Sequence, residues 1–70
     1  MTALWPVVRS YMPDGAPRVW SIPARGTVEA AELAISAAMA EARAAGGCDI
    51  ALEFHTGGDR GRCVMRWHCK

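Results

Sequence analysis

Hydrophobic and polar positions alternate with a helical period in the middle of the chain. At about 100° per residue, one side of this segment is apolar and consists of Val28, Ala31, Ala34, Ile35, Ala38, Met39 and Ala42. The opposite side carries Glu29, Glu32, Ser36 and Arg43. Thr27 precedes the pattern as a suitable N-cap, and Gly46 follows it as a C-terminal stop. The pattern predicts an amphipathic helix over residues 28–45 whose apolar side packs on a sheet.

Two strands are predicted before this helix, at residues 4–12 and 18–24. They flank the stretch PDGAP, in which proline and Asp-Gly favour a turn, so the two segments form a hairpin. Both sides of the first strand are mixed in character, which leaves the register open. Pro6 and Pro23 lack a backbone N–H, so each favours a sheet edge, a strand end or a bulge. One strand of this hairpin should therefore lie at a sheet edge.

A second hairpin is predicted after the helix, where Ile50, Leu52 and Phe54 alternate with polar residues and the chain ends in RCVMRWHCK. With residues 56–61 (TGGDRG) as the loop, the expected pairs are His55 with Arg62, Phe54 with Cys63, Leu52 with Met65 and Ile50 with Trp67. This register places one apolar set on a single face, beneath Ile35 and Met39: Ile50, Leu52, Phe54, Cys63, Met65 and Trp67. Truncation of Phe54 or Trp67 should then unfold the domain.

Together these elements predict a single α+β domain over residues 1–70. We expect an antiparallel sheet of about four strands in ββαββ order, with the helix packed on one face. Hydrophobic residues make up 51% of the chain and charged residues 21%, which excludes a disordered tail. The first residues do not resemble an export signal and no stretch approaches the roughly 18 apolar residues of a membrane span, so we predict a cytosolic protein, monomeric or a small homo-oligomer.

The three cysteines are expected to be free thiols, since no export signal points to an oxidising compartment. On one strand, Cys63 and Cys69 would lie about 20 Å apart, too far for a disulfide or a shared zinc ion. The predicted register sets Cys48 opposite Cys69, so this pair could cross-link on oxidation. His55 would lie at the far end of the hairpin and His68 on the face away from both cysteines. We therefore expect no metal site and no cofactor.

Catalytic motifs are also not expected. TGGDRG reads as a hairpin loop and not as a phosphate-binding fingerprint. Glu53 and His55 share a strand face, but Arg62 and Arg66 lie next to them, and ion pairing is the simpler interpretation. The sequence therefore predicts a non-enzymatic protein without catalytic residues.

Charge is distributed unevenly, with a negative middle (residues 27–55) and a positive end (residues 56–70). The candidate partner-binding residues lie on or beside the last hairpin: Arg60, Arg62, Arg66, His55 and His68. The three arginines are expected to be dispensable for folding, and a solvated face paired with Glu53 is the alternative interpretation. A net charge of +1 is too small for unaided binding of naked nucleic acid, so a protein or nucleoprotein partner is favoured.

The stretches TVEAAELAISAAMAEARAAGGCDIALEF and GRCVMRWHCK, in a chain of hairpin, alanine-rich helix and hairpin, resemble small phage-encoded anti-CRISPR proteins that act on type I systems. The resemblance implies a non-enzymatic inhibitor in the cytoplasm of a bacterial host. Such an inhibitor binds the CRISPR RNA-guided surveillance complex and blocks recruitment of DNA or of the nuclease. No functional residues carry over. Members of this group that imitate DNA are acidic, so the charge of +1 favours occlusion by a protein surface. The alternatives are a small antitoxin-like nucleic-acid-binding regulator and an orphan phage interaction protein.

Overall fold

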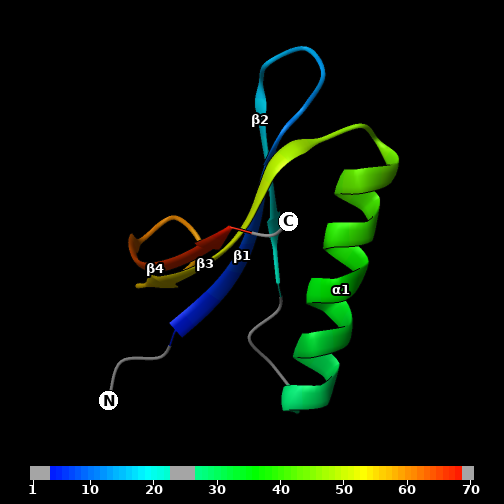
Figure 1. Cartoon of the computed structure of the whole chain (residues 1–70). Helices are drawn as coiled ribbons and strands as arrows, with labels where there is room; N and C mark the ends of the chain where they lie inside the picture. The colour runs from blue at the N-terminus through cyan, green and yellow to red at the C-terminus, as the bar shows by residue number, and fades with distance from the viewer. Residues whose placement is uncertain (1–3, 23–26, 69–70) are drawn as a thin grey trace.

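The chain forms a four-stranded antiparallel sheet with one helix on one face, which confirms the predicted α+β class (Figure 1). This computed structural model describes residues 4–22 and 27–68. The elements are β1 (Leu4–Tyr11), β2 (Pro17–Ser21), α1 (Val28–Ala44), β3 (Cys48–Thr56) and β4 (Arg62–His68). In space the strands follow the order β2-β1-β3-β4, so α1 connects β2 to β3 across the intervening β1. No helix of the described ranges is long and apolar enough to cross a membrane.

The first hairpin turns at the predicted stretch. Gly15 adopts a φ of +85°, which glycine tolerates readily, and its N–H donates to Met12 O at 2.8 Å. The Asp14 carboxylate accepts a hydrogen bond from the N–H of Ala16. β2 lies at the sheet edge, as predicted for one strand of this hairpin.

Pro6 lies in β1, an interior strand, yet it interrupts no pairing with β3. The N–H of Ile22 donates to Pro6 O, so the carbonyl of Pro6 points towards the β2 side. The nitrogen of a strand residue points to the same side of the strand as its carbonyl oxygen, so the nitrogen of Pro6 also faces the β2 side and not β3. The β1–β2 ladder ends beside Pro6, at the Val7–Ser21 pair. Pro6 thus occupies the end of a ladder. Pro23, the other proline considered, lies outside the described residues.

Helix α1 begins and ends as its sequence predicts. Thr27 Oγ1 accepts a hydrogen bond from the N–H of Ala30 at 3.1 Å. At the other end, Gly46 N–H donates to Arg43 O and Gly47 N–H to Ala42 O, which is the Schellman arrangement with Gly46 at a φ of +80°.

The core lies between α1 and the part of the sheet formed by β2, β1 and β3. Its buried residues are Val8, Ile22, Ala38, Ala42 and Ile50, with Trp20, Ala34, Ile35, Met39 and Leu52 partly buried around them. Of the predicted helical stripe, only Val28 in the first turn is largely exposed. A helix is about 10 Å wide and strands lie about 4.8 Å apart, so one helix covers about two inter-strand spacings. In Figure 1, α1 runs beside β2 and the β3–β4 hairpin extends away from it.

The expected core under β4 is therefore wrong. Met65 is 40% exposed and Trp67 52% exposed, and Phe54 is only partly buried, because α1 does not reach this end of the sheet. Cys63 lies on the opposite face altogether.

The register of the second hairpin also differs from the prediction. Phe54 pairs with Met65 and Leu52 with Trp67, two residues away from the expected partners. A shift of two keeps side chains on the same face, so Met65 and Trp67 still share a face with Leu52 and Phe54. Between Met65 and Cys63 the ladder is irregular, and Cys63 pairs with His55. This β-bulge turns Cys63 to the other side of the sheet.

Candidate functional site

The sheet face opposite α1, called here the open face, has a buried carboxylate at its centre. Glu53 lies on β3 between Val7 of β1 and Arg66 of β4, and its side chain has no exposed surface. Strand alternation puts His55 on the same face, and Arg9 of β1 reaches Glu53 diagonally from its pairing position opposite Ala51.

Three side chains from three strands donate to this carboxylate. Arg66 Nε lies 2.7 Å from Oε2, and Arg9 Nε lies 3.2 Å from Oε2 and 3.3 Å from Oε1. His55 Nε2 lies 2.9 Å from Oε1. These four residues are called the Glu53 cluster below. A buried charge is tolerated only when it is paired and hydrogen-bonded, and the cluster meets that requirement.

The cluster keeps Glu53 ionised. Burial raises the pKa of the Glu53 carboxyl, but the hydrogen bond from His55 and the charges and hydrogen bonds of Arg9 and Arg66 outweigh it. The pKa is therefore lowered from its ordinary value of 4.5.

The loop between β3 and β4 holds the His55 ring from its other side. His55 Nδ1 lies 3.0 Å from Gly61 O. At Gly61 a side chain would place its Cβ 1.6 Å from Thr56 O, so only glycine lets the loop close this tightly. His55 is buried, with 5% of its surface exposed.

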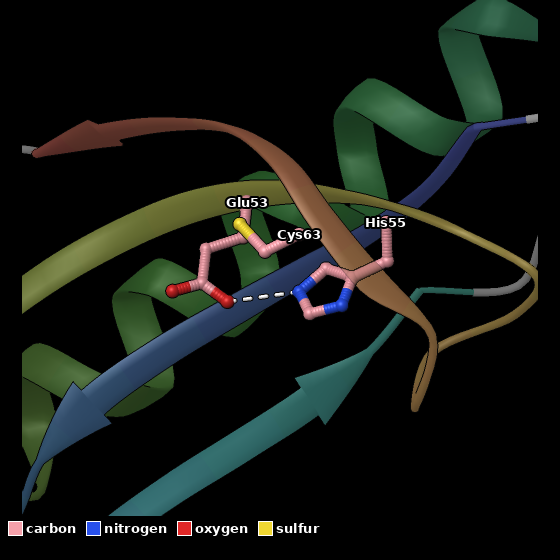
Figure 2. Close-up of side chains that lie close together, drawn as sticks. All are labelled: Glu53, His55 and Cys63. Atoms are coloured by element: carbon pink, nitrogen blue, oxygen red, sulfur yellow. Dashed lines mark hydrogen bonds and ion pairs between the residues drawn. The ribbon is translucent and has the colours of Figure 1, made fainter.

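Cys63 completes a compact group of ligand-type atoms on the open face. Figure 2 shows its sulfur above the Glu53 carboxylate and the His55 ring. One ligand atom from each of Glu53, His55 and Cys63 lies within 4.8 Å of the other two. Cys63 is partly buried, and its thiol donates to Met65 O at 3.4 Å.

Two hollows adjoin the Glu53 cluster. One, of about 430 Å³, includes Arg9, His55 and Arg60 in its lining, and the other, of about 300 Å³, includes Arg9, Arg66 and His68. Arg9 lines both hollows, and each also includes one aspartate, Asp59 in the first and Asp49 in the second.

On the α1 side of the sheet, the region that the helix leaves uncovered is apolar. We call it the apolar patch, and it consists of Leu4, Phe54, Met65 and Trp67. The Phe54 and Trp67 rings pack edge to face, with centroids 5.6 Å apart and planes at 89°. Arg62 pairs with Thr56, which places it on the same side of the sheet as this patch.

The predicted partner-binding residues do not form one surface. Arg60 is exposed in the loop and Arg62 is exposed beside the apolar patch, whereas Arg66 and His68 lie on the open face. His55 is buried with both ring nitrogens engaged, so it is not available to a partner. Arg66 was expected to be dispensable for folding, but it donates to the buried Glu53 carboxylate at 2.7 Å, so we now predict that its loss lowers stability.

The thiols at Cys48 and Cys63 are free, as predicted. Cys48 pairs with Tyr11 of β1, and the expected proximity of Cys48 to Cys69 involves a residue outside the described ranges. Arg9 and Cys63 were not expected at the site. Arg9 gave one signal in the sequence, since it is a charged residue directly after the apolar pair Val7 and Val8 in a predicted strand.

No protein-family model, curated protein or solved structure matches this chain.

Proposed function

We propose that this protein is a non-enzymatic inhibitor that docks on a nucleoprotein complex in the cytoplasm of a bacterial host. The resemblance to phage-encoded anti-CRISPR proteins gives the partner class, a type I CRISPR RNA-guided surveillance complex. The inhibitor occludes a surface that this complex needs for recruitment of DNA or of the nuclease.

The observation that carries the proposal is the apolar patch. Trp67 is 52% exposed, Leu4 41% and Met65 40%, and they adjoin the partly buried Phe54 on one face of the sheet. Clustered exposed apolar side chains are typical of protein interaction sites, and tryptophan is enriched among residues that dominate binding energy. Protein interfaces are also enriched in methionine and arginine.

The charges near the patch favour a partner surface with negative groups. Arg62 lies on the patch side, whereas Arg60 lies in the β3–β4 loop and lines a hollow on the open face, and neither arginine forms an ion pair within the described residues. An arginine beside an apolar centre fits a nucleoprotein surface better than imitation of DNA, which requires an acidic surface.

Binding to a purified type I surveillance complex tests the proposal. Wild-type protein should bind the complex and lower its occupancy by target DNA or by the nuclease. Trp67→Ala should weaken binding by about 30-fold or more, which corresponds to a hot spot of about 2 kcal/mol. Tyr11→Ala is the matched control, since Tyr11 is an aromatic residue of similar exposure (44%) outside the patch, and its affinity should stay within about threefold of wild type.

The arginines are tested by Arg60→Glu with Arg62→Glu. This double variant should retain the wild-type melting curve and bind more weakly, with a larger loss at low salt. Arg66 is left unchanged because a glutamate there would face Glu53. Failure of the wild type to bind any type I complex would overturn the proposed partner. Strong binding of naked DNA at physiological salt would instead favour the nucleic-acid-binding regulator.

A further inference from the structure

We propose that Glu53, His55 and Cys63 form a binding site for a thiophilic divalent transition metal of the Zn²⁺ class on the open face. The ligand atoms are Glu53 Oε1, His55 Nε2 and Cys63 Sγ. This site is independent of the proposed partner binding, since the apolar patch lies on the other face of the sheet.

The spacing of the three atoms is close to that of a tetrahedral zinc site. Zinc lies about 2.0–2.1 Å from nitrogen and oxygen and about 2.3 Å from sulfur, so two such ligands lie about 3.3–3.6 Å apart around the ion. One ligand atom from each of the three residues already lies within 4.8 Å of the other two, and His55 Nε2 and Glu53 Oε1 are 2.9 Å apart. Binding requires the His55–Glu53 contact to open by about 0.4 Å and the sulfur to move inward.

The His55 ring is held in the orientation that a metal ligand needs. A carbonyl oxygen only accepts hydrogen bonds, so the contact with Gly61 O places a proton on Nδ1. Metal-ligating histidines almost always donate their other ring N–H to a carbonyl or a carboxylate in this way. Nε2 is thereby directed at Glu53 and Cys63.

Oε1 is the carboxylate oxygen proposed for the metal. Arg66 donates to Oε2 at 2.7 Å, and Arg9 spans both oxygens at 3.2 and 3.3 Å, so the shortest arginine contact is made by the other oxygen. Oε1 faces His55. Arg9 and Arg66 thus act as outer-shell partners that fix the carboxylate for monodentate coordination.

The positive charges of Arg9 and Arg66 oppose a dication, and the ligands offset this. Metal binding takes the carboxylate, the neutral imidazole and the thiolate forms of these side chains. The two anionic ligands, Glu53 and Cys63, then balance the charge of one divalent ion.

The ligand types decide which metal is favoured. Thiolate and imidazole select Zn²⁺ and similar transition metals, whereas Mg²⁺ and Ca²⁺ prefer oxygen ligands. The ion can enter from the Cys63 side, since Cys63 is only partly buried while Glu53 and His55 are buried. With three protein ligands, a water molecule takes the fourth position.

The test is a titration with Co²⁺, a spectroscopic substitute for Zn²⁺, on a variant in which Cys63 is the sole cysteine (C48S/C69S). A thiolate-to-cobalt charge-transfer band in the near ultraviolet, saturating at about one equivalent, is the expected result. Addition of Zn²⁺ should remove the band. If C48S/C69S shows no band at saturating Co²⁺, the proposal is wrong.

Single substitutions locate the other ligands without removing Glu53, whose loss endangers folding. Cys63→Ser and His55→Gln should each weaken metal binding by at least about 100-fold, because outer-shell partners alone contribute 10- to 100-fold. His68→Gln is the matched control and should bind as wild type, since His68 is exposed and outside the ligand group. Equal loss in His55→Gln and His68→Gln would overturn the assignment of His55.

Thermal melting gives a readout that needs no thiolate band. With free Zn²⁺ at 100 times Kd, the melting temperature should rise by roughly 10–20 °C in the wild type. Cys63→Ser, once circular dichroism shows that it is folded, should not respond, and Mg²⁺ should have no effect on either protein. A wild-type melt that ignores Zn²⁺ contradicts the proposal.

Discussion

Glu53 carries a charge that the sheet buries completely, and Arg9, His55 and Arg66 donate to it from three strands. Glu53→Gln should lower the free energy of unfolding by about 2 kcal/mol, since hydrogen bonds to charged groups contribute about 1.5–3 kcal/mol and buried partners are left unpaired. Denaturant unfolding followed by circular dichroism measures the change.

The control for this substitution is Glu41→Gln. Glu41 pairs with Arg18 at 3.1 Å, but both side chains are about half exposed, so solvent screens the pair. Its loss should stay below about 0.5 kcal/mol. Equal losses in the two variants would mean that the Glu53 cluster does not stabilise the fold.

The lowered pKa of Glu53 predicts a specific sensitivity to acid. The unfolded chain takes up the proton near the ordinary value of 4.5, whereas the folded protein resists protonation until a lower pH. The stabilisation by Glu53 is therefore complete above that value and is lost as the pH falls through the pKa of the folded state. Between about pH 5 and pH 2, the free energy of unfolding should fall more steeply in the wild type than in Glu53→Gln. Parallel pH profiles for the two proteins would contradict this account.

Among the elements, the junction between α1 and β3 tolerates no side chain at Gly47. A Cβ there would lie 2.2 Å from Ser10 Oγ and 2.9 Å from Ala42 O. Gly47→Ala should therefore cost about 1–3 kcal/mol through overpacking, measured by thermal or denaturant unfolding.

A second substitution separates this clash from a general effect of alanine. Ser10→Ala removes the nearer of the two atoms, so the double variant should lose less stability than the sum of the two single variants. Strict additivity would show that the side chain of Ser10 is not the obstacle.

The bulge in β4 is the element that sets the chemistry of the open face. Without it, regular alternation from Met65 would keep Cys63 on the α1 side, as the sequence analysis expected. The extra residue of the bulge shifts the register, so that Cys63 pairs with His55 and its thiol lies close to Glu53. A bulge depends on pairing across two strands, so the alternation of a single strand cannot reveal it.

For the molecule as a whole, one helix cannot cover four strands, and the apolar patch is the consequence. Trp67→Ala should lower stability by only about 1 kcal/mol, since Trp67 is half exposed and its described ring contact is the edge-to-face pair with Phe54. This replaces the expectation that its truncation unfolds the domain. Ile50→Ala, in the core under α1, should cost about 2–5 kcal/mol. If Trp67→Ala were the more damaging of the two in thermal melts, the core would lie under β4 and not under β3 and β1.

The sequence by itself determined the local elements of this protein. Thr27 and Gly46 mark the ends of α1, the helical stripe identifies its inner side, and Asp14 with Gly15 forms the first turn. These features depend on interactions between residues a few positions apart, and such interactions are readable from spacing and residue type.

Only the tertiary structure decided how the elements meet. Three features depend on long-range packing. β1 lies between β2 and β3, α1 does not cover β4, and Arg9 contacts Glu53, which is 44 positions away in the sequence. The sequence did suggest ion pairing of Glu53 with Arg66, but it indicated neither its burial nor the role of Arg9. A hydrophobic pattern specifies which face of a strand is buried. It does not specify the neighbouring strand, because the strand order depends on how the whole sheet buries the most apolar surface beneath a single helix.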